Sequence, residues 1–266
     1  QVPVVAGAGD QAAGAAGAGA VSPGQALLSL GTSGVYFAAT DSFRPNPGSA
    51  VHAFCHCLPQ TWHQMSVMLS AASCLTWAAK LTGSANEAEL LDKIDERAQP
   101  SERLMFLPYL SGERTPHNDP HAMGVLVGID HETDAAALGR AVLEGVAFAF
   151  ADGQAALLGA GGAIDSVSVI GGGSRSALWG SILSSVLDRP LVYRKGGEVG
   201  PALGAARLAR IGVTGEAPAD VCTELPQDFV ALPEPGLRDH YAAGLARYRK
   251  LYPSLRESFR DAAPAT

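Results

Sequence analysis

Positive charge and cysteine are both scarce in this chain, and each shortage excludes a class of protein. The 266 residues carry 19 Lys and Arg against 26 Asp and Glu, which gives a formal net charge of −7. This balance excludes nucleic acid or an anionic membrane as the main partner, although local positive groups remain able to hold a small phosphate. The four cysteines, at positions 55, 57, 74 and 222, are too few for a disulfide framework at this length and favour a reducing, cytoplasmic location.

A leader sequence and long apolar runs are also missing. No apolar run approaches the ~20 residues that span a bilayer, and the start lacks the basic segment and apolar stretch of a signal peptide. The first residue is Gln1 rather than Met, and it opens directly into an apolar run that predicts a strand. We therefore expect this chain to be part of a longer protein, with an upstream half that it does not include.

Glycine is abundant in contrast, and its 31 residues separate short apolar runs. That pattern predicts strands joined by tight turns and alternating with helices. Strands are expected over 26–30, 34–39, 51–58, 62–68, 104–110, 124–129, 166–170 and 191–193. Helices are expected over 70–81 (inner face Leu75, Ala78, Ala79 and Leu81), 86–98, 134–158, 174–187, 199–211 and 237–251, with a loop-rich stretch over 212–235. This order indicates an α/β fold, a mixed sheet with flanking helices, in one domain over 1–266 with a helical tail from about residue 236.

Asp10 is the only acidic residue among the first forty. It follows the predicted strand and its glycines, and it precedes an alanine-rich helix. Open α/β sheets bind ligands at the carboxyl ends of their strands, which suggests a catalytic carboxylate. Asp is also a favoured helix N-cap, so a purely capping role stays open from the residues alone.

Two glycine-rich turns have the composition of phosphate-binding sites. The turn Gly31-Thr32-Ser33-Gly34 combines a flexible backbone with two hydroxyls, although ordinary hairpin turns share this composition. The triplet Gly171–Gly173 follows a strand and precedes a predicted helix, whose N–H groups favour anions or nucleotides. It matches neither the GxxxxGK[ST] nor the GxGxxG pattern. A third turn, over 196–201, is expected to serve backbone packing.

Histidine and cysteine gather over residues 52–63. On a strand, Cys55 and Cys57 face one side while His52 and His56 face the other. One ion cannot easily collect both pairs, so the spacing argues against a metal site.

Two polar groups elsewhere invite alternatives. The loop over 112–117 contains Glu113 and Arg114, which predicts either a functional loop or a solvated one held by contacts between these two residues. Glu144 lies among apolar residues of the longest predicted helix. It is expected to be a buried, hydrogen-bonded carboxylate that need not touch a ligand.

Six segments, in their order and spacing, resemble the C-terminal domain of the FGGY carbohydrate kinases. They are residues 4–14, 28–35, 106–116, 140–145, 170–173 and 200–206. The resemblance covers roughly residues 2–211 and is weaker beyond. It implies an actin-like ATPase, ribonuclease H-like fold, and a cleft in which sugar and ATP meet between this domain and an N-terminal sugar-binding domain that this chain lacks. It also suggests a homodimer.

The resemblance implies roles for individual residues. Asp10 would take the proton from the sugar hydroxyl, and Gln11 would help to hold the sugar. ATP, accompanied by Mg²⁺, would contact Gly31, Thr32, Ser33, Ser73, Thr76, Gly172, Gly173, Ser174 and Ala177, and no protein ligand to a metal is expected. Two positions depart from the usual pattern, namely Gln11, where relatives often have Asn, and Ala137, where a polar residue is usual.

The implied activity is the ATP-dependent phosphorylation of a sugar, with D-xylulose as the expected substrate. Glycerol, ribulose and gluconate are alternatives on the same scaffold. A non-catalytic, actin-like nucleotide-binding module is the alternative from another class, and Asp10 would then be only a helix cap.

Overall fold

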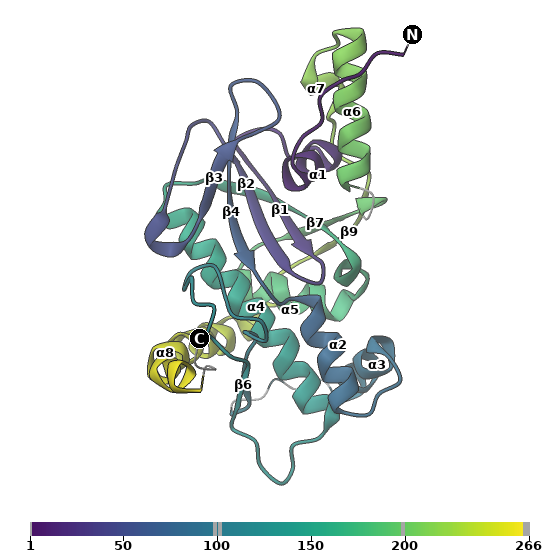
Figure 1. The fold of residues 1–266 in the computed structure, drawn as a ribbon. Coiled ribbons are helices and arrows are strands. Elements are labelled where there is room, and N and C mark those ends of the chain that lie inside the picture. The colour runs from purple at the N-terminus through teal and green to yellow at the C-terminus, as the bar shows by residue number, and fades with distance from the viewer. Residues whose placement is uncertain (1, 98–99, 101–102, 198–199, 263–266) are drawn as a thin grey trace.

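The computed structural model describes residues 2–97, 100, 103–197 and 200–262. Within that part of the chain, seven strands form one mixed sheet in the order β3-β4-β2-β1-β7-β8-β9 (Figure 1). Its strands are β1 (Gly24–Leu30), β2 (Gly34–Thr40), β3 (His52–Cys55), β4 (Trp62–Met68), β7 (Ile164–Ile170), β8 (Leu191–Arg194) and β9 (Gln227–Ala231). A small separate sheet pairs β5 (Met105–Leu107) with β6 (Val125–Val127). The predicted mixed sheet is confirmed.

Strand pairing places two glycine turns at one edge of the sheet. β1 runs antiparallel to β2, with Leu30 opposite Gly34, and parallel to β7, with Ser29 opposite Ile170. The short turn after β1 permits the antiparallel pairing, whereas parallel pairing requires a long crossover. Because β1 and β7 are parallel neighbours, their carboxyl ends lie together, and so do the turns that follow them.

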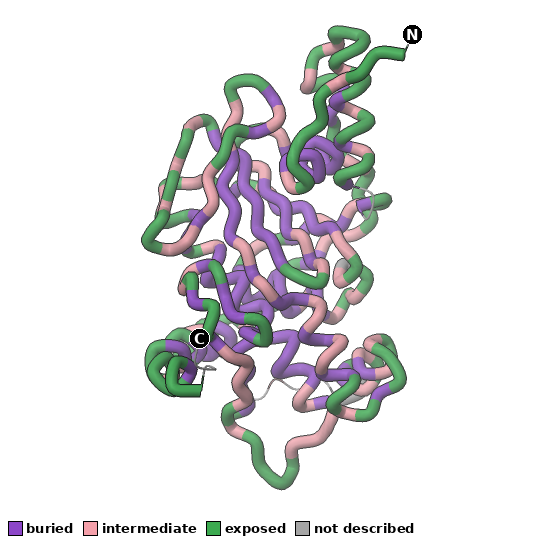
Figure 2. The backbone as a smooth tube through the Cα atoms, in the orientation of Figure 1, coloured by how far each residue is buried: buried purple, intermediate pink, exposed green. Residues whose placement is uncertain are grey.

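Helices cover both faces of the sheet (Figure 1). They are α1 (Asp10–Ala18), α2 (Ala72–Leu81), α3 (Glu87–Arg97), α4 (Ala135–Gly159), α5 (Ala177–Leu187), α6 (Gly200–Thr214), α7 (Pro218–Val221) and α8 (Arg238–Asp261), with short 3-10 turns η1 (Pro47–Ser49) and η2 (Gly172–Arg175). Alternate residues of β2 serve the two faces: Tyr36 packs into the core shared with α4, and Phe37 into the core shared with α1. Figure 2 shows the sheet strands buried between these layers.

Helix α4 is the central helix of the larger core. It is long and apolar enough to cross a membrane by length and composition, with a mean hydropathy of 1.4 over an 18-residue window. Arg140, Glu144 and Asp152 interrupt it, so α4 is not a continuous apolar run of the ~20 residues that span a bilayer. Because 83% of that window is buried inside the fold, the composition of α4 is that of a core helix.

Helix α8 extends ten residues beyond its predicted end at residue 251 and contains Pro253 in its interior. Four rings, Tyr241, Tyr248, Tyr252 and Phe259, are buried along it and join the main core. Their burial on both sides of Pro253 offsets the backbone hydrogen bond that proline removes. The predicted tail is thus an integral part of the core.

Other boundaries depart from prediction. Residues 2–9 form no strand, since Val2 and Val4 are 88% and 99% exposed and pair with no other strand in the described chain. The stretch expected as loop contains β9, which pairs with β8. Leu81 is 56% exposed at the end of α2 rather than on its inner face. The strands expected over 51–58, 104–110 and 124–129 are shorter, and the expected helix residue 98 lies outside the described residues.

Candidate functional site

A cavity of about 680 Å³ lies where β1 and β7 end. We call it the sheet-end cavity. The two glycine turns form one side of it, and α2, α3 and α5 supply apolar walls. Its lining residues are Leu30, Gly31, Thr32, Ala72, Leu75, Thr76, Glu87, Ala88, Leu91, Gly172, Gly173, Arg175, Ser176 and Trp179. Its size and mixed lining are those of a small-molecule pocket.

The turn after β1 is fixed to the start of α2 by main-chain hydrogen bonds. The carbonyl of Gly31 accepts the N–H of Ala72, and the carbonyl of Thr32 accepts the N–H of Ala71. The hydroxyl of Ser73 also donates to the Thr32 carbonyl at 2.9 Å. These bonds leave the turn in one defined conformation at the rim of the cavity.

The glycine triplet lies against the end of β1. Gly171 has φ +96°, and a Cβ atom there would lie 2.8 Å from the Leu30 carbonyl oxygen. A Cβ atom on Gly173 would lie 2.6 Å from Cγ of Leu30, whereas Gly172 faces open space. Glycine is therefore required at two of the three positions so that the backbones can approach closely.

Helix α5 begins later than predicted, at Ala177, after the 3-10 turn η2. Its N-cap is Ser176, whose hydroxyl accepts the N–H of Trp179 at 3.2 Å. The indole N–H of Trp179 donates to the carbonyl of Leu143 on α4, also at 3.2 Å. The floor of the sheet-end cavity is thereby tied to the central helix.

A second cavity of about 450 Å³ adjoins the first, since both are lined by Thr32, Ala72 and Thr76. Ser73, Trp77 and Lys80 complete its lining. A hydrogen bond from Thr76 lowers the pKa of Glu87, which keeps that carboxyl ionised at the wall of the sheet-end cavity.

The structure brings most of the predicted nucleotide residues together. Gly31, Thr32, Thr76, Gly172 and Gly173 line the sheet-end cavity, and Ser73 lines the adjoining one. Ser33 and Ala177 line neither, and the side chain of Ser174 lies outside the described residues. Sequence reasoning missed Trp179, which lies beyond the segment from the glycine triplet to Ala177 that was assigned to the nucleotide. It also missed the α3 residues Glu87, Ala88 and Leu91, for which the local sequence gives no signal.

Asp10 is the first residue of α1, and Gly9 occupies the N-cap position. The carboxylate nevertheless accepts the N–H of Gln11 at 2.9 Å, and the Gln11 side-chain amide lies 3.4 Å from its other oxygen. Asp10 is exposed and lines neither cavity described above. Its carboxylate is therefore held in place by Gln11 while it remains open to solvent.

Helix α1 is held against α6 by backbone contact rather than by large side chains. A Cβ atom on Gly17 would overlap the Gly200 carbonyl oxygen, and one on Gly204 would overlap the carbonyl oxygen of Ala13. Such packing leaves little room for α1 to shift along α6. The helix that carries Asp10 is thus fixed in position.

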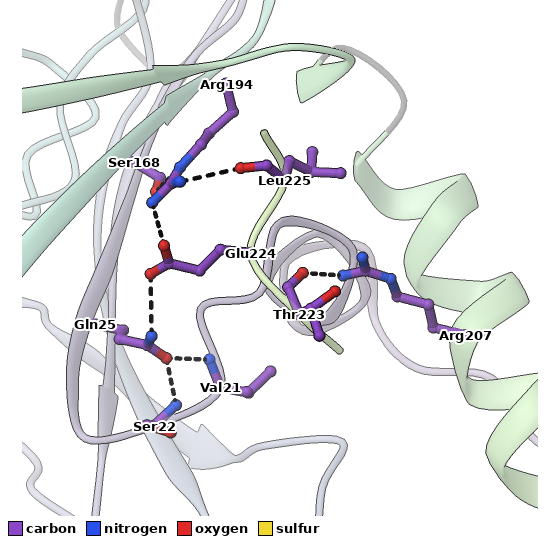
Figure 3. A network of polar contacts seen from close by, with 9 residues as sticks. All are labelled: Val21, Ser22, Gln25, Ser168, Arg194, Arg207, Thr223, Glu224 and Leu225. Carbon is purple, nitrogen blue, oxygen red and sulfur yellow. Dashed lines mark hydrogen bonds and ion pairs between the residues drawn. The ribbon is translucent and has the colours of Figure 1, made fainter. Parts of the chain in front are cut away.

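Two arginines reinforce this corner (Figure 3). Arg207 of α6 donates to the carbonyls of Ala16 and Gly17 at the C-terminal end of α1 and to that of Thr223. Arg194 of β8 donates hydrogen bonds to Ser168, Leu225 and Glu224. Glu224 also accepts a hydrogen bond from the side-chain amide of Gln25. The amide oxygen of Gln25 accepts the N–H groups of Val21 and Ser22. The segment 223–225 therefore links α1, α6 and the sheet.

The loop over 112–117 is not the solvated loop that one interpretation predicted. Glu113 is 2% exposed, and burial raises its pKa to about 8. Its Oε1 accepts the N–H groups of Leu69 and Arg114, while its Oε2 is buried without a partner in the structure. A protonated carboxyl group therefore anchors this loop to the end of β4.

Glu144 is a buried, hydrogen-bonded carboxylate, as predicted. It pairs with Arg140 at 2.9 Å and accepts a hydrogen bond from the Tyr241 hydroxyl of α8. Within the described chain, no group of three or more His, Cys, Asp or Glu side chains has the arrangement of a metal site. The cluster around His56 contains instead two buried imidazoles, His56 and His63, packed against Phe37.

Comparison with known proteins extends this description. The model of the FGGY family of carbohydrate kinases, C-terminal domain, matches residues 26–213. The chain is 52% identical over 255 residues to the xylulose kinase of Escherichia coli K12, covering 96% of this chain and 53% of that protein. It is 49% identical over 257 residues to the xylulose kinase of Klebsiella pneumoniae, covering 95% and 52%. The chain thus spans about half the length of the curated relatives it matches.

Solved structures of sugar kinases are also similar to this chain. A xylulose kinase from Brucella ovis superposes with a TM-score of 0.90 at 48% identity, over 94% of this chain and 52% of that one. A glycerol kinase from Plasmodium falciparum shares the fold, with a TM-score of 0.78 at 18% identity, over 91% and 49%. These sugar kinases have the actin-like ATPase fold, in keeping with the mixed sheet and flanking helices described above. The chain therefore belongs to the FGGY family of carbohydrate kinases and matches its C-terminal domain.

Proposed function

We propose that this chain supplies the ATP-binding and proton-accepting side of a cytoplasmic D-xylulose kinase. The observation that carries the proposal is the 52% identity to a xylulose kinase across 96% of the chain. In this proposal the other half of the kinase provides the remaining sugar contacts, and a homodimer is the expected assembly.

ATP is assigned to the sheet-end cavity. Its apolar walls, Leu75, Leu91 and Trp179, suit a purine ring, and the turns at Thr32 and Gly172 suit the phosphates through their main-chain N–H groups. Arg175 at the wall adds a positive charge close to the glycine triplet. Mg²⁺, carried with ATP, would neutralise phosphate charge during transfer.

Asp10 is assigned as the general base. A sugar hydroxyl is a weak nucleophile, and an ionised carboxylate within hydrogen-bond reach accepts its proton as oxygen bonds to the γ-phosphorus and ADP departs. The fixed position of α1 and the bond from Gln11 hold that carboxylate in one orientation. Closure of the two halves around the sugar would keep water from accepting the phosphoryl group.

The test is ADP release from Mg-ATP with and without D-xylulose, using this chain alone and extended by its upstream coding sequence. We expect xylulose-dependent release only in the extended protein. Asp10→Asn should abolish it while ATP still binds, and Asp228→Asn, a change at another exposed carboxylate, should leave it intact.

Other outcomes are equally informative. Release that depends on glycerol or ribulose but not on xylulose would assign a different substrate to the same site. No sugar-dependent release at all would favour the non-catalytic nucleotide-binding module. In such a module the carboxylate of Asp10 would serve only to accept the N–H of Gln11 at the start of α1.

A further inference from the structure

A third cavity, of about 430 Å³, lies between α4, α8 and the loop after β5. We call it the α8 pocket. It is lined by Asn46, Ser49, Tyr109, Pro116, His117, Asp152, Ala155, Ala156, Gly159, Tyr248, Arg249 and Tyr252. Among the residues that the structure describes, none lines both this pocket and the sheet-end cavity. Figure 1 shows α8 on the opposite side of α4 from α2 and α3. The α8 wall lies beyond residue 213, where the match to the family model ends.

The cavity exists because α4 has small residues where α8 and the loop after β5 have aromatic rings. Ala155 and Gly159 are exposed residues of α4 at the pocket, and a Cβ atom on Gly159 would meet nothing within 4 Å. Opposite them, the rings of His117 and Tyr252 stack with centroids 3.6 Å apart. The stacked pair makes one wall stiff, and the small residues leave space in front of it.

The polar groups of the pocket are arranged for hydrogen bonding without net charge. Asp152 is 8% exposed and accepts a hydrogen bond from Nε of Arg249 at 2.6 Å. That bond uses one of five guanidinium N–H donors and one of two carboxylate oxygens. The hydroxyl of Tyr109 bridges His117 and Tyr248, at 3.1 and 3.0 Å. The cavity wall therefore carries both donors and acceptors.

This chemistry selects among ligand classes. A hydrocarbon would remove water from the Asp152–Arg249 pair and return no hydrogen bonds. A phosphate group would face the carboxylates of Asp152 and, through Tyr252, Asp119. A hydroxyl group donates to a carboxylate and accepts from a guanidinium at once. Burial lowers the pKa of His117 to about 4, so its ring is neutral; Nε2 bonds the Tyr109 hydroxyl, which leaves Nδ1 as the other polar atom of the ring.

We propose that the α8 pocket binds a neutral polyhydroxylated compound of the size of a pentose or pentitol. The volume lies within the range of small-ligand pockets, about 300–1,000 Å³. This site is separate from the proposed catalytic site, and its occupancy does not depend on Asp10 or on the nucleotide.

The test is calorimetric titration of this chain with xylitol, with inorganic phosphate and toluene as anionic and apolar probes. We expect saturable binding of xylitol that persists in Asp10→Asn, so that failure of the kinase proposal leaves this test unaffected. Ala155→Phe, which fills the pocket from an exposed position, should abolish binding. The matched control Leu158→Phe changes a residue of the same helix that is 38% exposed and does not line the pocket, and it should bind normally.

Two further variants keep the test decisive. Gly159→Leu fills the pocket by a second route if Ala155→Phe does not fold. Arg249→Lys keeps the charge but loses the planar fork, and should weaken binding roughly tenfold, or about 1.4 kcal/mol. The proposal is overturned if xylitol shows no saturable binding, if both filled variants bind as the parent does, or if phosphate or toluene binds more tightly than xylitol.

Discussion

The two faces of the central sheet are packed by opposite means. On the α1 face, glycine and alanine let α1 approach the backbone of α6, and the buried titratable groups include the neutral imidazoles of His56 and His63. On the α4 face, large rings such as Phe150 fill the core, and a buried titratable group of the loop beside it is the carboxyl of Glu113. The first face holds α1 in a fixed position, while the second supplies most of the buried apolar area.

The largest expected effect tests backbone contact on the α1 face. Gly204→Val should destabilise the fold by more than about 5 kcal/mol, because its side chain would overlap the Ala13 carbonyl. Urea unfolding monitored by circular dichroism measures this loss. Gly236→Val, at a position where a Cβ atom meets nothing within 4 Å, is the control. A folded Gly204→Val variant of normal stability would show that α1 and α6 are free to separate.

The α4 face should respond to lost volume instead. Phe150 is fully buried against Gly34, so Phe150→Ala leaves a cavity and should cost about 3–5 kcal/mol in unfolding free energy. Phe43→Ala, at a ring that is 58% exposed, should cost far less. Equal losses in the two variants would contradict the assignment of the core to this face.

Glu113 should make the protein less stable as pH rises. Its folded pKa of about 8 lies above the ordinary 4.5, so the folded state keeps a proton that the unfolded chain releases. Stability is then lost as pH increases from about 4.5 through 8, by about 2–4 kcal/mol. Glu113→Gln should remove this slope in urea midpoints measured across the range, and Glu132→Gln, at an exposed position, should retain it.

His63 should act in the opposite direction and more weakly. Burial lowers the pKa of His63 in the folded state to about 4, from 6.5 in the unfolded chain. Between these two pH values the unfolded chain binds a proton that the folded state does not bind. Stability is lost as pH falls from about 6.5 to 4, by about 1–2 kcal/mol at pH near 5. His63→Phe should flatten the acid side of the stability profile, whereas His131→Asn, an exposed substitution, should not. An unchanged acid limb would mean that His63 is solvated.

Sequence alone predicted what depends on local pattern. Helices α2 and α4, the β1–β2 hairpin and the glycine turns follow from residue periodicity and turn composition, and α4 begins where its predicted range does, with Asp134 as its N-cap. The missed features depend on distant partners. β9 exists because it pairs with β8, and α8 continues past Pro253 because its rings are buried.

The residues of the candidate site also fall into those that local sequence pattern predicts and those that depend on distant partners. The residues of the two glycine turns were identified because both turns carry their own signal. Glu87 and Leu91 come from a polar helix that reaches the cavity only through tertiary packing. The buried state of Glu113 was also missed, because nothing beside it in sequence shows that the N–H of Leu69, just after β4, binds its carboxyl group.

Helix α4 is connected to both cavities, since its Leu143 carbonyl accepts a hydrogen bond from Trp179 of the sheet-end cavity and its Ala155 lines the α8 pocket. Each residue inserted into or deleted from a helix turns everything beyond it by about 100° and shifts it by about 1.5 Å. A single insertion between these positions would swing Ala155 off the pocket wall while Trp179 kept its place. The number of residues between Leu143 and Ala155 must therefore stay as it is if both contacts are to be kept.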